Sequence, residues 1–423
     1  MNSPSTHDPG EKTHRPEGAN VDSDSPETVS GAGNIVLPEY VLLVGSKIMH
    51  RRDFLLGSIG VGTAAPGGDC AAAPSNEPIR AALRQTVGGR EKVAGTVAVV
   101  IDEDGMSRVS YGNSGVSGVT MDAQTVFEIG SITKVMTALL LADMEARAEV
   151  TVDDPVAKYL PSSVTVRERG RPITLLDLAT YTSGLPKLPG NLPANWWANP
   201  NPFVSYSVDN LYEFVSGYTP QYEPGTHFEY SSLGFGLLGI ALARRAGKSY
   251  QELLIERICR PLGISHTRID LSAEMQKHLV QPHGLDLKPT PLWEFSPALR
   301  GAGSVRGSVA DVALFLKTCM GLMNSPLRGP LARLLETRRP TNLAGTDAGL
   351  GWFTSSDGKE EIAWKSGLTG GCNSFIGFST KRRCGALILS NFVWQPLDVG
   401  TTAMGMKLIS PKFDPGDLQS LYQ

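Results

Sequence analysis

The fold of this chain is decided by FEIGSITKVMTALL, residues 127–140, where one serine stands directly ahead of a helical pattern. From Ile132 onward, apolar residues recur at the i, i+3, i+4, i+7 and i+8 positions of an amphipathic helix. Ser131 is therefore expected at the helix start, where free backbone N–H groups and the positive end of the dipole favour an oxyanion. Lys134 follows one turn later on the same face. The stretch predicts a hydroxyl nucleophile and an amine that can take its proton, provided that burial among cations keeps the amine neutral.

A Ser-x-x-Lys tetrad by itself is weak evidence for catalysis. A chain of this length should contain about one by chance, and a second copy runs from Ser356 to Lys359 in a glycine-containing turn. On the tetrad alone, Ser131 could be an ordinary N-cap serine. Two later motifs, at residues 230–232 (Tyr-Ser-Ser) and 365–367 (Lys-Ser-Gly), add a phenol and a second amine. Such groups can manage the proton of a serine in acyl transfer through a covalent ester.

In this order, the motifs resemble those of the serine penicillin-recognising family, which includes class C β-lactamases, D-alanyl-D-alanine carboxypeptidases and related esterases. The resemblance covers roughly residues 80–410. It also rests on LLDLATYTSGLP at residues 175–186, on Pro224-Gly225 and on KSGLTGG at residues 365–371. It implies a serine hydrolase that works through an acyl-enzyme, without a metal or another cofactor, on a small-molecule or peptidoglycan-derived substrate.

The resemblance also implies roles for individual residues. Ser131 would be the acylated nucleophile, Lys134 its proton partner and Tyr230 the general base. Lys365 would attract a substrate carboxylate, and the backbone N–H groups of Ser131 and Leu368 would form the oxyanion hole. Read without the family, Tyr230 could be a core tyrosine and Lys365 a solvated lysine at a strand end. The predicted substrate-binding residues are Ser232, Lys365, Ser366, Gly367 and Leu368.

Three positions depart from the family pattern. Ser232 stands where an asparagine is usual, so the site would offer a hydroxyl in place of an amide to the substrate. Thr133 differs from the small residue usual in class C enzymes and resembles the carboxypeptidase and esterase branches. Tyr181 replaces a more common histidine, a change for which the sequence supplies no reason. His227 reads as a surface or loop histidine.

These observations favour an exported serine hydrolase that acts on a β-lactam or a D-Ala-D-Ala peptide. A carboxylesterase of the same fold and a slowly deacylating penicillin-binding or sensor protein are the alternatives. The absence of a Gly-x-Ser-x-Gly elbow argues against an α/β-hydrolase, and the lack of His-paired carboxylates argues against a metallo-β-lactamase. A net charge of −3, with no basic run among aromatics, argues against nucleic-acid binding.

The apolar patterns predict an α+β fold, with an antiparallel sheet built from both chain ends, flanked by helices, and a largely helical second lobe. The sheet lobe is expected over about 79–150 and 346–410, and the helical lobe over about 150–345. Helices are predicted over 79–87 and 397–409, and strands over 95–101, 107–111, 362–365, 374–378 and 385–390. The serine hydrolase domain as a whole would span 74–423.

The first 73 residues are not expected to belong to this domain. Residues 1–48 read as disordered or as an over-long start, because they are rich in polar residues, Pro and Gly and Met49 precedes an export-type segment. Residues 49–73 combine Arg51-Arg52, an apolar stretch and a small-residue end, which resembles a twin-arginine signal peptide. A buried apolar segment beside two chance arginines is the alternative. The signal predicts a periplasmic or secreted protein with no membrane span after its removal.

Four cysteines would remain in the exported chain. Cysteines of an exported chain could pair, but their spacing matches no metal or redox motif, so we favour free buried thiols and predict no metal site. The four are Cys259, Cys319, Cys372 and Cys384.

Overall fold

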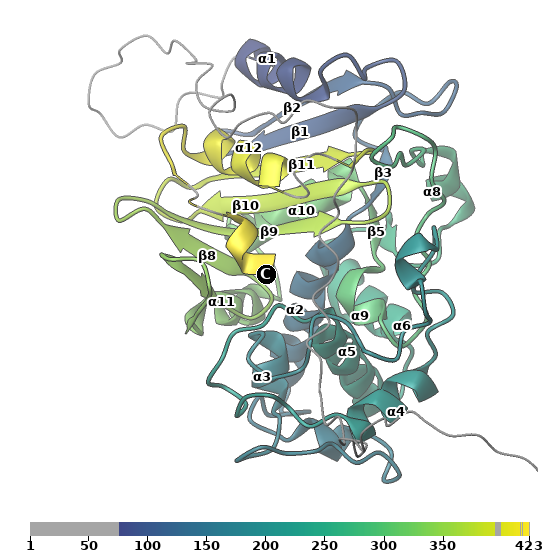
Figure 1. The fold of residues 1–423 in the computed structure, drawn as a ribbon. Helices are drawn as coiled ribbons and strands as arrows, with labels where there is room; N and C mark the ends of the chain where they lie inside the picture. The colour runs from purple at the N-terminus through teal and green to yellow at the C-terminus, as the bar shows by residue number, and fades with distance from the viewer. Residues whose placement is uncertain (1–75, 394–398, 415, 417, 423) are drawn as a thin grey trace, which may run out of the picture. The chain divides into compact units, whose positions relative to one another are not determined.

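An eight-stranded sheet in the order β2-β1-β11-β10-β9-β8-β7-β6 organises the computed structural model, which describes residues 76–393, 399–414, 416 and 418–422 (Figure 1). All neighbouring strands run antiparallel. Strands β1 (Gly95–Ile101) and β2 (Met106–Gly112) come from the N-terminal side. The other six come from the C-terminal side, so the α+β prediction of a sheet built from both ends is confirmed. They are β6 (Arg339–Pro340), β7 (Thr346–Ala348), β8 (Phe353–Ser356), β9 (Glu361–Leu368), β10 (Asn373–Ser379) and β11 (Cys384–Ser390).

Helices cover both faces of the central strands. Every residue of β1, β10 and β11 is buried, as expected of strands that are covered on two sides. Helix α12 (Val399–Ile409) lies in front of the sheet in Figure 1, and α10 (Val309–Cys319) lies behind it. Helix α1 (Asn76–Val87) packs on β2 through Ile79, Leu83 and Val87, which share one helical face. The central strands of the sheet are therefore sandwiched between helices.

Three helices pack against one another next to the candidate site. They are α2 (Thr133–Ala146), α5 (Ser232–Ala246) and α9 (Arg300–Gly303). Helices α5 and α9 touch through glycines, since a Cβ on Gly301 would lie 2.5 Å from the Phe235 carbonyl oxygen. This close approach holds α9 against the interior of the fold.

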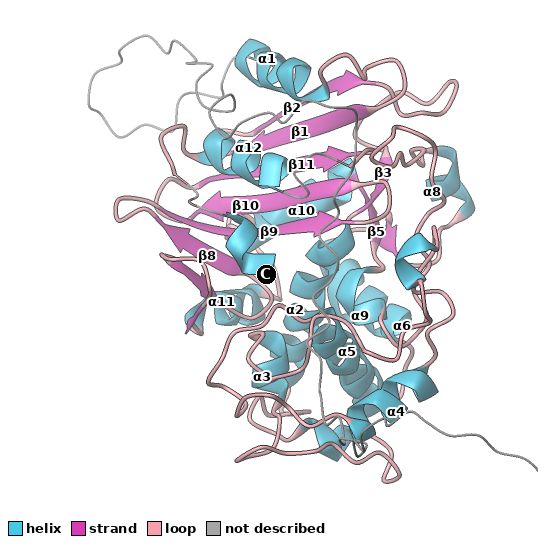
Figure 2. Cartoon of the chain, in the orientation of Figure 1, coloured by secondary structure: helices cyan, strands magenta, loops and turns pink. Residues whose placement is uncertain are grey.

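A second, three-stranded sheet was not predicted. Its order is β3-β5-β4, from β3 (Val126–Glu128), β4 (Thr267–Arg268) and β5 (Arg306–Ser308). Otherwise the stretch from 150 to 345 is mainly helices and loops (Figure 2). The remaining helices are α3 (Leu175–Ala179), α4 (Val208–Gly217), α6 (Tyr250–Leu254), α7 (Arg260–Leu262), α8 (Ala273–Lys277) and α11 (Arg328–Glu336).

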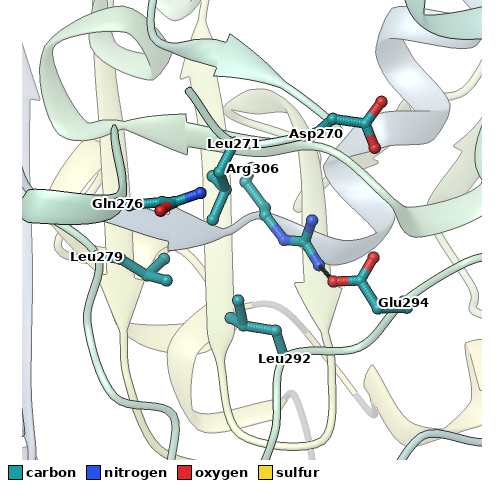
Figure 3. A pocket seen from close by; sticks show the side chains of 7 residues that line it. All are labelled: Asp270, Leu271, Gln276, Leu279, Leu292, Glu294 and Arg306. Carbon is teal, nitrogen blue, oxygen red and sulfur yellow. Dashed lines mark hydrogen bonds and ion pairs between the residues drawn. The ribbon is translucent and has the colours of Figure 1, made fainter. Parts of the chain in front are cut away.

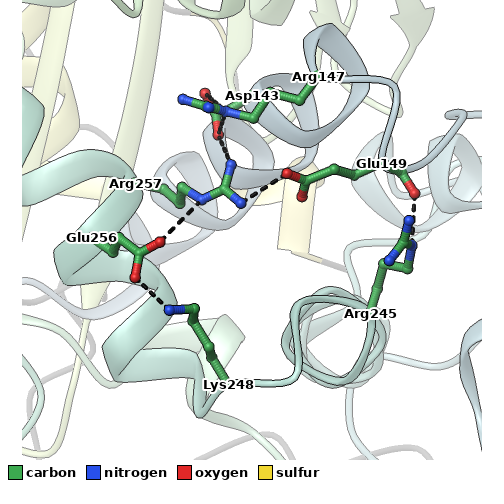
Figure 4. Close-up of polar contacts among 7 residues, drawn as sticks. All are labelled: Asp143, Arg147, Glu149, Arg245, Lys248, Glu256 and Arg257. Carbon is green, nitrogen blue, oxygen red and sulfur yellow. Dashed lines mark hydrogen bonds and ion pairs between the residues drawn. The ribbon is translucent and has the colours of Figure 1, made fainter.

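An ion-pair network fixes the far end of α2 (Figure 4). The guanidinium of Arg257 donates to Asp143 at 3.2 Å and to Glu149 at 2.8 Å, and Arg147 donates to Asp143 at 2.9 Å. Arg245 from the end of α5 adds a bond to the Glu149 carbonyl at 2.8 Å. Because Asp143 is buried and shared by two arginines, this network is expected to hold more strongly than isolated surface pairs.

Cys259 and Cys372 are buried thiols and Cys319 is a half-buried one, none of them in a disulfide, while Cys384 is also buried. Burial raises the pKa of the Cys259 thiol to about 12, so this thiol stays protonated at neutral pH. Within the part of the chain that the structure describes, no helix is long and apolar enough to span a membrane. The segments predicted over 1–48 and 49–73 lie outside the described residues, and those predictions stay open.

Candidate active site

Ser131 lies in a short 3-10 turn, Gly130–Ile132, that connects β3 to α2. The turn begins with Gly130 at φ +49°, and a Cβ at this position would lie 2.8 Å from the Leu368 nitrogen. Glycine therefore permits both the left-handed backbone and the close approach of β9. Ser131 is half-buried at the start of the helical segment, two residues ahead of Thr133, the first residue of α2.

Lys134 is fully buried beside this serine. Its Nζ lies 3.0 Å from Ser131 Oγ and donates to the Ala302 carbonyl of α9 at 2.7 Å. Burial holds the pKa of Lys134 well below its ordinary value, and the charges of Lys365 and Lys187 lower it further. A neutral amine at this distance has a lone pair with which to accept the seryl proton.

Tyr230 and Lys365 form the other side of the site. Lys365 is fully buried on β9, and its Nζ donates to the Tyr230 hydroxyl at 3.3 Å. The Tyr230 ring also lies close to both lysine nitrogens, at 5.0 Å from Lys134 Nζ and 4.4 Å from Lys365 Nζ. Cations in a desolvated site stabilise the phenolate form of a tyrosine, which is the form that acts as a base. The structure thus brings Ser131, Lys134, Tyr230 and Lys365 together from distant parts of the chain.

Tyr181 supports this site in a way that the sequence did not reveal. Its ring stacks on Tyr230 with 5.0 Å between centroids and 20° between planes, and it lies 5.3 Å from Lys365 Nζ. The residue is buried and has φ +59°, while its hydroxyl points to the Gly351 carbonyl at 3.4 Å. A bulky residue with positive φ is uncommon and is kept only where its surroundings require it. Tyr181 therefore packs against one face of the Tyr230 ring, at a position where the family more commonly has a histidine.

The third motif, Lys-Ser-Gly at residues 365–367, runs along the turn that holds Ser131. A Cβ on Gly367 would lie 2.2 Å from the Ile129 carbonyl oxygen and 2.9 Å from the Ser131 nitrogen, so only glycine fits there. Leu368, the last residue of β9, follows directly. The backbone amides of Ser131 and Leu368 therefore belong to adjoining segments, as two donors to one oxyanion must. Ser366 is buried on the same strand.

The two serines of the second motif have different environments. Ser231 caps α5, because its Oγ accepts the Gly234 N–H at 2.8 Å and donates to the Pro186 carbonyl at 2.7 Å. Ser232 is the first helical residue and is half-buried, with its backbone N–H bonded to the Lys187 carbonyl at 2.9 Å. Ser231 is thus a structural cap, and Ser232 is the serine of this pair with an accessible side chain.

The remaining residues noted in the sequence have simpler explanations. Thr133 is buried, and its hydroxyl accepts the Val305 N–H at 3.1 Å, which ties α2 to the segment after α9. His227 lies in an exposed loop and stacks on Tyr222 with 4.0 Å between ring centroids. Among the described residues, no group of three or more His, Cys, Asp or Glu side chains could hold a metal ion.

A pocket of about 240 Å³ opens beside Tyr230. Lys187, Glu229 and Asn342 contribute polar groups to its wall, and Leu421 from the C-terminal segment closes another side. Burial raises the pKa of Glu229 above its ordinary value. The pocket can therefore receive a polar group of a substrate next to the phenol.

Comparisons with known proteins concern the family and the fold of the chain. The family model described as Beta-lactamase matches residues 79–403. The D-alanyl-D-alanine-carboxypeptidase/endopeptidase AmpH of Escherichia coli K12 is 30% identical over 312 residues, which cover 70% of this chain and 78% of that protein. A beta-lactamase of the same organism is 26% identical over 338 residues, covering 71% and 85%. The crystal structure of a beta-lactamase/D-alanine carboxypeptidase from Yersinia pestis has a TM-score of 0.66 at 24% identity, covers 79% of this chain and 99% of that one, and supports the fold.

Proposed function

The chain belongs to the beta-lactamase family of serine hydrolases, and we propose that it cleaves D-Ala-D-Ala type amides, with β-lactams as alternative acylating substrates. The observation that carries this proposal is the 3.0 Å contact between Lys134 Nζ and Ser131 Oγ in a buried site with a second cation, Lys365. The name of the AmpH relative, a D-alanyl-D-alanine carboxypeptidase, supports the peptide as the main substrate.

Acylation would begin when Ser131 Oγ attacks the amide carbonyl carbon and its proton passes to Lys134 or Tyr230. The negative charge on the carbonyl oxygen would be stabilised by the N–H groups of Ser131 and Leu368. The leaving amine would then take a proton from the Tyr230 hydroxyl as the C–N bond breaks. Water would attack the Ser131 ester in the second half, with Tyr230 as the base that accepts the proton of the water.

Positive charge in the site fits an anionic substrate. A D-Ala-D-Ala peptide ends in a carboxylate, and Lys365 and Lys187 would attract it into the site. Both lysines act electrostatically on Lys134.

A carboxylesterase activity is the second candidate. Ser232 offers a hydroxyl where the family usually offers an amide, and an ester substrate does not need an amide partner. Slow deacylation would make the protein a penicillin-binding or sensor protein, which would show one burst of product and then stop.

A fluorescent penicillin tests the nucleophile. We expect the wild-type protein to be labelled and Ser131→Ala to be unlabelled, while the matched variant Ser356→Ala is labelled as in the wild type. Labelling that survives in Ser131→Ala would contradict the assignment. Comparing kcat/KM for a D-Ala-D-Ala peptide and a p-nitrophenyl ester then separates peptidase from esterase, and a chromogenic cephalosporin separates turnover from a single burst.

We also propose that residues 49–73 direct export and that the hydrolase domain follows from residue 74. The support is the arginine pair Arg51-Arg52 ahead of an apolar stretch and a small-residue end. Replacing both arginines by lysine should retain the protein in the cytoplasm, as measured by cell fractionation. Unchanged export of this variant would contradict a twin-arginine signal.

A further inference from the structure

Glu128 is a buried carboxyl group for which the mechanism above has no use. It is the last residue of β3, three positions before Ser131, and only 3% of its surface is exposed. Its Oε1 accepts the Trp293 N–H at 2.6 Å and its Oε2 accepts the Thr369 hydroxyl at 2.7 Å. Thr369 directly follows Leu368, whose amide we place in the oxyanion hole. Glu128 therefore connects the strand ahead of the nucleophile to the end of the third motif.

The bonds of Thr369 indicate which form of Glu128 the structure requires. Thr369 Oγ1 accepts the Cys372 N–H at 3.1 Å, and the Thr369 N–H donates to the Cys372 carbonyl at 3.0 Å. The hydroxyl proton of Thr369 is thus directed at Glu128, and the Trp293 N–H approaches the other oxygen. A carboxylate accepts both, whereas a protonated carboxyl group brings a third proton to a place that already has two donors.

Trp293 also packs against the loop that follows Thr369. A Cβ on Gly370 would lie 2.3 Å from Trp293 Nε1, so the indole is packed directly on the segment that follows Thr369. Glu128 binds the backbone of Trp293 and the side chain of Thr369 at the same time. The end of β9 is therefore held from both sides through one carboxyl group.

The charged and titratable groups around Glu128 shift its pKa in opposite directions. Arg306 is its cross-strand partner on β5, and the Arg306 guanidinium reaches a pocket of about 580 Å³, where it pairs with Glu294 at 2.7 Å (Figure 3). The buried Cys372 thiol lies in the β9–β10 loop. Burial raises the pKa of Glu128 to about 7, against the two hydrogen bonds and the charge of Arg306, while the negative charge of Glu294 adds to the rise.

We propose that Glu128 is a positioning residue whose carboxylate holds the end of β9, and with it the Leu368 amide, against the turn of Ser131, so that full turnover requires its ionised form. The proposal rests on the function proposed above. Protonation removes one of the two bonds and releases the Thr369 segment. The oxyanion donor then moves away from the position where charge develops, which slows the chemical step more than it weakens substrate binding.

The test is a set of pH profiles of kcat and KM with a diacetylated Lys-D-Ala-D-Ala peptide. The wild type should lose activity as the pH falls below about 7, the pKa of Glu128. In Glu128→Gln we expect kcat to fall on the order of 10- to 100-fold, KM to stay within about twofold, and the ionisation near neutrality to disappear from the profile. Glu128→Asp keeps a carboxylate and should keep an acid limb at reduced kcat.

Glu294→Gln is the matched distal variant, because Glu294 is largely exposed and lies outside the proposed catalytic groups. Removing its negative charge should lower the pKa of Glu128 and move the acid limb to lower pH, with the plateau of kcat unchanged. This variant carries the test even where Glu128→Gln fails to fold. Acid limbs that coincide in the wild type and Glu294→Gln, or a wild-type limb near pH 7 that is unchanged in Glu128→Gln, overturn the proposal.

Failure of this inference is distinguishable from failure of the proposed function. A wild-type protein that a fluorescent penicillin does not label at Ser131 contradicts the function itself. If the wild type is labelled and active, but the acid limb is the same in the wild type and in both variants, only the role of Glu128 is contradicted.

Discussion

Two Ser-x-x-Lys tetrads stand in this chain, and the structure places them in opposite environments. In the first, Lys134 is fully buried with its Nζ 3.0 Å from Ser131 Oγ. In the second, Ser356 is exposed at the end of β8 and Lys359 is exposed in the turn between β8 and β9. Ser356 Oγ there accepts the Gly358 N–H at 3.2 Å, an ordinary turn contact.

The difference shows that spacing and surroundings make separate contributions. The i, i+3 spacing can bring an amine near a hydroxyl, but water around Lys359 keeps its ammonium solvated. Around Lys134, burial and the charges of Lys365 and Lys187 lower the pKa of the amine. Reactivity therefore comes from what surrounds the tetrad, and four kinds of substitution can test this comparison.

Replacing Ser131 or Ser356 by alanine should produce the largest difference in activity between the two tetrads. Ser131→Ala eliminates the proposed nucleophile and should lower kcat/KM for a D-Ala-D-Ala peptide on the order of 10⁴-fold or more. Ser356→Ala should leave kcat/KM unchanged, because Ser356 is exposed at the end of β8. Steady-state kinetics at equal folded fraction measure both. Equal loss in the two variants would mean that position in the fold does not distinguish the tetrads.

Arginine at the two lysine positions separates charge from proton acceptance. Lys134→Arg keeps a cation that cannot accept the seryl proton, so kcat should fall on the order of 10²- to 10⁴-fold. Lys359→Arg should retain wild-type kinetics. In the wild type, the acylation rate should fall as acidification protonates Lys134, at a pH well below its ordinary pKa because burial lowers that pKa. Stopped-flow acylation by a chromogenic cephalosporin measures these rates, and a fast Lys134→Arg enzyme would remove Lys134 from the mechanism.

Tyr230 sharpens the comparison because it joins the buried tetrad to the third motif. Tyr230→Phe loses the hydroxyl that Lys365 contacts at 3.3 Å, and deacylation should slow on the order of 10²-fold. Mass spectrometry should then detect an acyl-enzyme that persists after mixing with a β-lactam. Tyr181→Phe is the control, since the contact of its hydroxyl with the Gly351 carbonyl is long, at 3.4 Å, and its ring remains to stack. A similar loss in both variants would point to ring packing and not to the phenol.

The smallest expected effect is on stability. Replacing Lys134 should raise the free energy of unfolding, although it lowers activity. Because burial lowers the pKa of Lys134, the folded state binds fewer protons than the unfolded state between that pKa and about 10.5, and stability rises with pH across this window. Lys134→Met removes this cost, so its free energy of unfolding near pH 7 should exceed that of the wild type by about 1 kcal/mol. The gain should shrink as the pH approaches 10.5, as urea denaturation can measure. Lys359→Met should stay within about 0.5 kcal/mol, and a destabilised Lys134→Met would contradict the argument.

Much of the fold was predictable because its signals are local. The strands at 95–101 and 385–390 are continuous apolar runs, and the structure confirms both with the pairing of β1 and β11. The sheet of β3, β4 and β5 escaped prediction because strands of two or three residues are too short to show a period.

The candidate site was predictable only in part for a related reason. Ser131 and Lys134 are one helical turn apart, so their proximity follows from the sequence. Tyr230 and Lys365 are distant in the chain, and only their order in a family pattern indicated a shared site. The roles of Tyr181 and Glu128 could not be read from the sequence, because they depend on partners that folding supplies from elsewhere.

The sequence by itself determined that a serine precedes an apolar-faced helix, that a lysine follows one turn later, and that both chain ends supply strands. Only the tertiary structure decided which Ser-x-x-Lys tetrad is buried, what stacks beneath Tyr230 and what holds the end of β9. The physical reason is that desolvation and charge–charge interactions depend on distance in space. Burial lowers the pKa of Lys134, and the charge of Lys365, from a distant part of the chain, lowers it further.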